Sequence, residues 1–324
     1  MLYPILLLLV GFVILIKGAD FLVNGASSAA KRYGISNLAI GLTVVAFGTS
    51  MPELIVSLLS AIDGKNDASF GNVIGSNNFN LMFILGIAGL IFPLVVQRNT
   101  VKYEVPLSLL AAGVLYLLVN DTSLWGGAVN VLSRVDALIL LVFFGLFMMY
   151  VYRTMTSSTD LDSGDEIKIY SMGKSLLFVV LGLVMLVGGG QLVVDNAIAI
   201  AHAAHLSDKL IGLTILAAGT SLPELATSAV AAYKKNTDIA IGNVIGSNIF
   251  NIFFILGITG LIHPIDYNTA MNFDIIVLLI STVVLMIFMF TLNTRKLDRW
   301  EAFLLLMAYV TYTIYLVGLE EGLA

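Results

Sequence analysis

Two glutamate residues of this chain lie inside long apolar segments, at equivalent positions of an internal repeat. Residues 36–94 align with residues 207–265 without a gap at an offset of 171, and 33 of the 59 aligned positions are identical. The aligned glutamates are Glu53 and Glu224. An ionised carboxylate in hydrocarbon costs about 3 kcal/mol or more, so two of them at matched positions indicate a function. The pair predicts a charged substrate near the centre of a bilayer.

Each glutamate follows a proline in a short motif, GTSMPE at residues 48–53 and GTSLPE at residues 219–224. Proline lacks an N–H and its ring clashes with the carbonyl four residues earlier, so the helix is expected to break there. In lipid, the freed carbonyls must find another ligand or line a cavity. The motif therefore predicts that oxygens of Thr49, Ser50 and Glu53 face one site. The second copy presents the same set: Thr220, Ser221 and Glu224.

A second repeated motif, GNVIGSNNFN at residues 71–80, adds further oxygen ligands. Ser76 and Asn80 are four residues apart and share a helix face. The second copy, at residues 242–251, contains Ser247 and Asn251. The glycines form small-xxx-small surfaces that allow close helix approach. A site made only of oxygens suits hard cations such as Ca²⁺ and Na⁺, and two carboxylates balance one Ca²⁺. Because the two ions have similar radii, competition for one site is a basis for exchange.

The composition indicates a membrane protein. Hydrophobic residues make up 59% of the 324 residues, charged residues 11%, and the mean hydropathy is +0.98. Soluble domains carry about 25% charged residues. There are no cysteines, which excludes disulfides, thiolate metal sites and cysteine nucleophiles. The N-terminal apolar stretch has no signal-peptide cleavage pattern, so we interpret it as a retained span.

The hydropathy pattern predicts an all-α polytopic protein with ten transmembrane helices, each of about 20 apolar residues. The predicted spans are 2–30, 37–60, 67–93, 103–119, 133–152, 173–203, 208–232, 239–263, 273–292 and 300–318. The longest polar gap separates two five-helix halves. The predicted division is a first repeat at 1–152, a cytoplasmic linker at 153–172 and a second repeat at 173–324.

The distribution of lysine and arginine predicts the orientation of these spans. With the N-terminus outside, twelve such residues fall in cytoplasmic loops and three in external loops. This positive-inside bias predicts that both termini lie outside the cell membrane and that the central loop is cytoplasmic. Since each half has an odd number of spans, the second half enters the membrane inverted. Inverted repeats are typical of secondary transporters, whose substrate site lies near the midplane between the repeats.

The paired motifs GTSMPE/GNVIGSNNFN and GTSLPE/GNVIGSNIFN resemble the two alpha repeats of the sodium/calcium exchanger family, within the calcium/cation antiporter superfamily. The resemblance covers nearly the whole chain. It implies a Na⁺/Ca²⁺ antiporter of the prokaryotic type that works by alternating access, exchanges three Na⁺ for one Ca²⁺ and moves one net charge per cycle. It also implies that the first and sixth helices slide across the remaining bundle, and that the monomer is functional.

The resemblance also implies roles for individual residues. Ca²⁺ would lie between the carboxylates of Glu53 and Glu224 and the carbonyls of Thr49 and Thr220. Asn80 and Asn251 would complete the centre. The Na⁺ sites would share the glutamates and use six further residues: Ala46, Ser50, Ser76, Ala217, Ser221 and Ser247. We expect Ca²⁺, Na⁺ and the lipid bilayer as partners, with no nucleic acid, no prosthetic group and no enzymatic activity.

Other functions remain open from the sequence. Potassium-dependent relatives typically carry Asp where this chain has Asn251, so the neutral amide favours potassium independence. Ca²⁺/H⁺ exchange is a further alternative within the superfamily, and a cation channel is an alternative outside it. The repeated residues could also have structural roles only. The glutamates would then be hydrogen-bonded carboxyls, the serines would bond helix backbone, and the asparagines would bridge helices. Lys17 and Asp20, at i and i+3 in the first span, predict a local ion pair.

Overall fold

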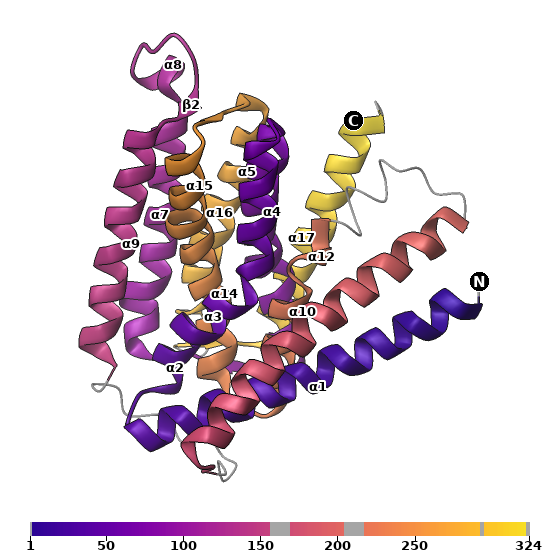
Figure 1. Cartoon of the computed structure of the whole chain (residues 1–324). Helices are drawn as coiled ribbons and strands as arrows, with labels where there is room; N and C mark the ends of the chain where they lie inside the picture. The colour runs from indigo at the N-terminus through magenta and orange to yellow at the C-terminus, as the bar shows by residue number, and fades with distance from the viewer. Residues whose placement is uncertain (1, 156–168, 204–216, 292–294, 322–324) are drawn as a thin grey trace.

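The computed structural model describes residues 2–155, 169–203, 217–291 and 295–321, which are mostly helical (Figure 1). Labels with η denote π- or 3-10 helical segments. The first half contains α1 Leu2–Tyr33, α2 Asn37–Ile40, η1 Gly41–Val45, α3 Ala46–Thr49, α4 Met51–Ile62, α5 Asn66–Asn78, η2 Phe79–Ile84, α6 Leu85–Ile91, β1 Leu94–Val95, η3 Thr100–Glu104, α7 Val105–Val119, α8 Asp121–Leu124, β2 Val131–Leu132 and α9 Arg134–Thr154.

The second half contains α10 Met172–Ala203, α12 Ala217–Gly219, α13 Leu222–Tyr233, α14 Thr237–Ile249, η5 Phe250–Leu256, α15 Gly257–Ile262, β3 Ile265–Asp266, η6 Thr269–Met271, α16 Asn272–Phe288, β4 Lys296–Leu297 and α17 Arg299–Glu321. Helices α4 and α13, and likewise α5 and α14, begin 171 residues apart, the offset of the sequence repeat.

The helices confirm the all-α membrane class. Eight helical stretches in the described residues are long and apolar enough to cross a membrane: Tyr3–Tyr33, Asn66–Ile91, Thr100–Val119, Arg134–Thr154, Met172–Ala203, Thr237–Ile262, Thr269–Phe288 and Arg299–Gly318. A ninth candidate is the bent pair Asn37–Thr49 and Met51–Ile62. The remaining predicted span, 208–232, lies partly outside the described residues, so the count of ten stays a prediction.

Two short antiparallel strand pairs connect the two halves of the chain. Strand β1 pairs with β4, and β2 pairs with β3. Strand β3 is the repeat equivalent of β1, since they begin at residues 265 and 94. Each pair therefore joins one strand from each half of the chain. These strands were not predicted, because a pattern of two residues is too short to indicate a strand.

Helices α1 and α10 pack antiparallel along most of their length (Figure 1). Glycines allow this close approach: a Cβ added to Gly182 would lie 2.6 Å from the backbone nitrogen of Leu22, and one added to Gly18 would lie 3.0 Å from the Gly182 oxygen. A Cβ on Gly11 would similarly lie 3.2 Å from the Gly189 oxygen. Such spacing leaves no room for side chains, so the two helices form a single close-packed pair.

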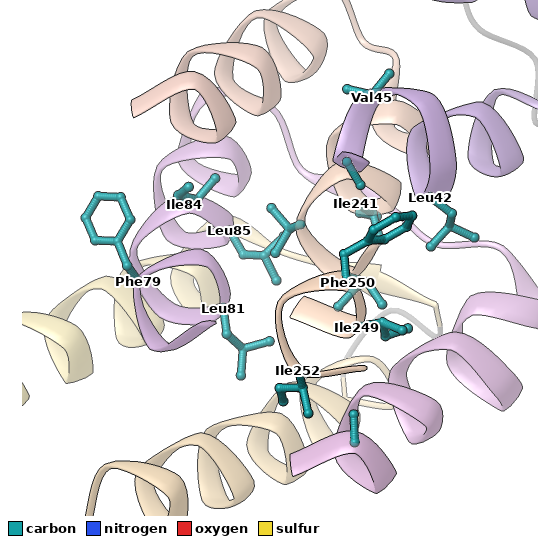
Figure 2. Close-up of a cluster of buried hydrophobic side chains, with 14 of the residues drawn as sticks. Leu42, Val45, Phe79, Leu81, Ile84, Leu85, Ile241, Ile249, Phe250 and Ile252 are labelled. Carbon is teal, nitrogen blue, oxygen red and sulfur yellow. The ribbon is translucent and has the colours of Figure 1, made fainter. Parts of the chain in front are cut away.

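A cluster of buried apolar side chains packs around helix α14. All thirteen residues of α14 are buried. Figure 2 shows Ile241 and Ile249 of this helix near Leu42 of η1 and near Phe250 of η5. A Cβ on Gly246 would lie 2.9 Å from the Leu42 oxygen, which confirms the predicted close approach for this copy of the motif.

The first copy of the glycine motif has no close neighbour among the described residues. Within the described residues, nothing lies within 4 Å of a Cβ placed on Gly71 or Gly75. Gly41 and Leu42 contact the second copy at Gly242, and their repeat equivalents, residues 212 and 213, lie outside the described part of the chain. The predicted close approach therefore stays a prediction for this copy.

Candidate cation-binding site

The two helix breaks lie where the prolines predict them. Helices α3 and α4 meet at a bend of 46°, and Ser50 at the bend has φ −85° and ψ 7°. Its equivalent Ser221, between α12 and α13, has φ −91° and ψ 7°. Pro52 and Pro223 lie in the first turn of the helices that follow. These first turns also contain Glu53 and Glu224, where the positive end of the helix dipole favours a negative charge.

The two glutamates are held by serines across the repeat boundary. Ser221 Oγ donates to Glu53 Oε1 at 3.0 Å, and Ser50 Oγ donates to Glu224 Oε1 at 2.9 Å. Both carboxylates are at most 1% exposed. Each half of the chain therefore supplies a hydroxyl to the carboxylate of the other half.

The serines of α5 and α14 complete both clusters. Ser76 Oγ lies 3.5 Å from Glu53 Oε1 and 3.0 Å from Ser221 Oγ. Ser247 Oγ lies 3.4 Å from the Glu224 carboxylate and 2.9 Å from Ser50 Oγ. A serine donates one hydrogen only, so each of these triangles retains acceptor oxygens.

Four buried oxygens of the site have no hydrogen-bond partner in the described residues. They are the second carboxylate oxygens of Glu53 and Glu224 and the amide oxygens of Asn80 and Asn251. Unpaired buried polar atoms cost free energy and native proteins rarely keep them without a reason. Two carboxylates and two amide carbonyls form a set of hard oxygen ligands whose charge matches one divalent cation. The donor set therefore fits Ca²⁺ as a transported substrate.

The amide orientation of both asparagines is fixed by their neighbours. Asn80 donates its Nδ2 to Asn248 Oδ1 at 3.1 Å, and Asn251 donates to Asn77 Oδ1 at 3.0 Å. Asn77 and Asn248 in turn donate to each other's backbone carbonyls, at 3.2 and 3.3 Å. These bridges use the amide nitrogens of Asn80 and Asn251 and leave their oxygens to the site. Asn77 and Asn248 thus act as interhelical bridges.

Two residues that shape the site were not singled out from the sequence. Asn243 donates to the Glu224 carbonyl at 3.3 Å and to Ser228 Oγ at 2.9 Å, and its Oδ1 accepts from Thr49 Oγ1 at 3.1 Å. Asn72 makes the same three contacts, with Glu53, Ser57 and Thr220: 3.1, 2.8 and 3.2 Å. Their repetition at offset 171, four residues before Ser247 and Ser76, was the available signal.

The structure places the other predicted ligands less directly. Ala46 is buried one turn before Ser50, and its carbonyl accepts the Ser50 N–H at 3.0 Å. Thr49 is fully buried, whereas Thr220 is partly exposed. Ala217 begins α12, and its side chain lies outside what the structure describes. The structure therefore gathers the glutamates, serines, threonines and six asparagines of the repeats.

The π-helical segments explain how the asparagines reach the site. Segments η2 and η5 begin directly after α5 and α14 and contain Asn80 and Asn251. The widened turn of a π-helix shifts side chains away from the α-helical register and is frequent at functional sites. We predicted that Ser76 and Asn80 share a helix face on the assumption of a continuous α-helix. In the structure, the chain changes from α-helix to π-helix between these two residues.

Asp20 does not form the local pair predicted with Lys17. Its carboxylate forms an ion pair with Lys234, at the C-terminal end of α13. The prediction considered only neighbours on the same helix, whereas α1 packs against α13 in the folded chain.

Comparison with known proteins identifies the family of this chain. The family model for the sodium/calcium exchanger protein matches residues 3–153 and 174–318. The chain belongs to this family. The exchanger-family chain is 33% identical over 343 residues to the sodium/calcium exchanger MaX1 of Methanosarcina acetivorans, with 96% of this chain and 97% of that protein covered. It is 36% identical over 293 residues to the inner membrane protein YrbG of Escherichia coli, with 88% of each covered.

A solved structure also matches this exchanger-family chain. The sodium-calcium exchanger NCX_Mj superposes with a TM-score of 0.78 and 32% sequence identity, and the match covers 96% of this chain and 97% of that one. Together with the apolar helices, the family establishes a multi-pass membrane protein. Family membership supports Ca²⁺/cation antiport with Na⁺ and Ca²⁺ as substrates.

A first prediction concerns the supporting asparagines. Asn243→Ala removes three buried hydrogen bonds around Glu224. At about 1 kcal/mol for each lost bond, it should lower the rate of Ca²⁺ transport about a hundredfold. Asn72→Ala should have a smaller effect because Asn72 is only partly buried. ⁴⁵Ca²⁺ uptake into proteoliposomes measures both. Equal rates for wild type and Asn243→Ala would contradict a positioning role for this amide.

Proposed function

We propose that this protein exchanges Na⁺ for Ca²⁺ at the buried site between the two glutamates. The observation that carries the proposal is the set of four unpaired oxygens, one pair from each half of the chain. In the proposed Ca²⁺-bound state, Glu53 and Glu224 neutralise the ion, and Asn80, Asn251 and the carbonyls of Thr49 and Thr220 add oxygens. All six are hard ligands, as Ca²⁺ prefers.

The proposed Na⁺ sites share the carboxylates with Ca²⁺. Each would combine a glutamate with the hydroxyls that already bond it, and the backbone of Ala46 and Ala217 would complete the ligands. The hydroxyls are Ser50, Ser76, Ser221 and Ser247. Because the glutamates are common to both ions, Na⁺ and Ca²⁺ would exclude each other. Such exclusion couples the two fluxes without a separate gate.

The proposed cycle is electrogenic and uses alternating access. Three Na⁺ would replace one Ca²⁺, so one net charge would move per cycle. Both termini would lie outside and the central loop in the cytoplasm, as the positive-inside bias predicts. One chain would suffice, because the two halves supply complementary parts of the site. Asn251 gives the centre a neutral amide and supports exchange without K⁺.

The test is ⁴⁵Ca²⁺ uptake into proteoliposomes loaded with Na⁺. We expect uptake to need internal Na⁺ and to be unaffected by K⁺. Since three Na⁺ would leave for each Ca²⁺ that enters, one net positive charge would leave the vesicle. A membrane potential set with K⁺ and valinomycin should therefore accelerate uptake when the interior is positive. Dependence on K⁺ would assign the K⁺-dependent branch, and dependence on a pH gradient the Ca²⁺/H⁺ branch. Uptake that is indifferent to every counter-ion would instead indicate a channel.

A further inference from the structure

The α1–α10 pair contacts the two halves of the chain unequally. Helix α1 packs along α13, whereas the described residues show no comparable packing of α10 against α4. By the repeat, these two contacts are equivalent, because α10 corresponds to α1 and α4 corresponds to α13. Figure 1 shows the pair running away from the bundle towards the N-terminus. The structure therefore contains one of two contacts that the repeated sequence could make.

Polar side chains fasten α1 to the turn between α13 and α14. Lys234 forms an ion pair with Asp20, and its Nζ donates to Asn24 Oδ1 at 2.7 Å. Asn236 donates to Ser27 Oγ at 3.0 Å. The three α1 residues lie on one helix face, at i, i+4 and i+7. The Lys234 side chain is 28% exposed, so this contact is shielded more than a surface ion pair. We call this set the α1 latch.

The equivalent positions carry complementary groups that are not engaged with each other. On α10, Gln191 corresponds to Asp20 and Asp195 to Asn24. Gln191 Nε2 donates to Asp195 Oδ1 at 2.8 Å within the same helix, and both residues are exposed. In the α4–α5 turn, Lys65 pairs with Asp63 at 3.5 Å, and their side chains are 69% and 60% exposed. An ammonium and a carboxylate are thus available on the two elements that this second contact would join.

The two turns have the same backbone. Gly64 and Lys235 are equivalent and adopt left-handed conformations, with φ of 74° and 58°. The next residues donate matching backbone bonds: Lys65 N to Ser60 O at 2.8 Å, and Asn236 N to Ala231 O at 2.8 Å. Asn236 corresponds to Lys65, and its partner Ser27 corresponds to Ile198 on α10. Asp195 lies three residues before Ile198, so the α4–α5 turn can present Lys65 within one helical turn of this carboxylate.

We propose that Asp195 and Gln191 of α10 form a second latch with Lys65 and Asp63, which replaces the α1 latch when the transporter changes the side to which it opens. The proposal rests on the alternating access proposed above. The close glycine packing makes α1 and α10 move as one body. When the α1–α10 pair packs against α13 at one end of the bundle, it is separated from α4 at the other end. The two latches are then alternatives, and their relative strength sets the population of the two states.

Cysteine cross-linking tests this directly, because the chain has no native cysteine. Ser27→Cys with Asn236→Cys reports the α1 latch and should cross-link with copper phenanthroline. Lys65→Cys with Asp195→Cys reports the second latch and should also cross-link in membranes that supply both ions. Lys65→Cys with Val184→Cys is the matched control, since Val184 is exposed on α10 three turns before Asp195. This control pair should stay reduced.

A third substitution separates a conformational role from a structural one. In the Lys65→Cys/Asp195→Cys protein, adding Lys234→Met should raise the cross-linking rate about three- to thirtyfold, because removal of the α1 latch shifts the equilibrium by roughly that factor. No 65–195 cross-link, or a rate unchanged by Lys234→Met, overturns the proposal. Cross-linking is read without transport, so wild-type protein that moves no Ca²⁺ under a Na⁺ gradient would refute the proposed function separately.

Discussion

Glu224→Gln is expected to abolish Na⁺-dependent Ca²⁺ transport while the protein still folds. In the proposed site, Glu224 supplies one of the two charges that neutralise Ca²⁺ and belongs to the Na⁺ ligands as well. Removing one buried charge of an interacting set costs about 2–5 kcal/mol, which is roughly 30- to 5,000-fold in affinity. Glutamine keeps the shape and can still accept from Ser50, whose hydroxyl donates to Glu224. ⁴⁵Ca²⁺ uptake into Na⁺-loaded proteoliposomes measures the loss.

Glu104→Gln is the matched control for this substitution. Glu104 is also buried, at 1% exposure, but it accepts a hydrogen bond from Tyr150 and makes no contact with the serines of the site. Its glutamine variant should fold and transport Ca²⁺ at a rate close to wild type. If both variants lost transport equally, buried carboxylates in general would be needed for folding or stability, and Glu224 would have no special role. Glu53→Gln should behave as Glu224→Gln does.

Gly182→Leu is expected to destabilise the α1–α10 pair strongly. The backbone nitrogen of Leu22 lies 2.6 Å from where the new Cβ would be, so the two helices must separate. Overpacking of this kind costs about 3 kcal/mol, because backbone cannot move aside as a flexible side chain can. Thermal unfolding in detergent, followed by the melting temperature, measures the effect. Transport should fall with it, since the pair loses its close packing.

Gly188→Leu on the same helix provides the comparison. Gly188 is exposed, and a Cβ there meets nothing within 4 Å in the described residues. The added leucine should face lipid and leave the melting temperature nearly unchanged. A large drop for Gly188→Leu, or none for Gly182→Leu, would contradict the glycine-mediated packing of α1 and α10.

Local rules predicted much of this site. Proline chemistry placed the breaks at Pro52 and Pro223, two residues after the observed breaks at Ser50 and Ser221. The cost of burying carboxylates in hydrocarbon singled out the same two residues, and the repeat supplied their serine and asparagine neighbours. The structure brings these residues together, and their roles as ion ligands stay predictions. Each inference depends on a residue's own backbone or charge, and the duplication showed each signal twice.

Contacts between distant segments were harder to predict. Asp20 pairs with Lys234, more than 200 residues away, although Lys17 is its nearest cation in sequence. The supporting contact between Asn243 and Thr49 crosses from one half to the other in the same way. The π-helical segments also escaped prediction, because their side chains are as apolar as those of an ordinary membrane helix. Such features depend on which helices meet, and one sequence does not specify that pairing.

The pairing of short strands between the halves has a consequence for how such a chain could arise. Both strands of each half pair with strands of the other half, and each carboxylate accepts a hydrogen bond from a serine of the opposite half. A half-length ancestor would therefore have been incomplete alone. It would have needed a second copy inserted in the opposite direction through the same membrane, so a single gene would have had to yield both orientations before duplication joined them.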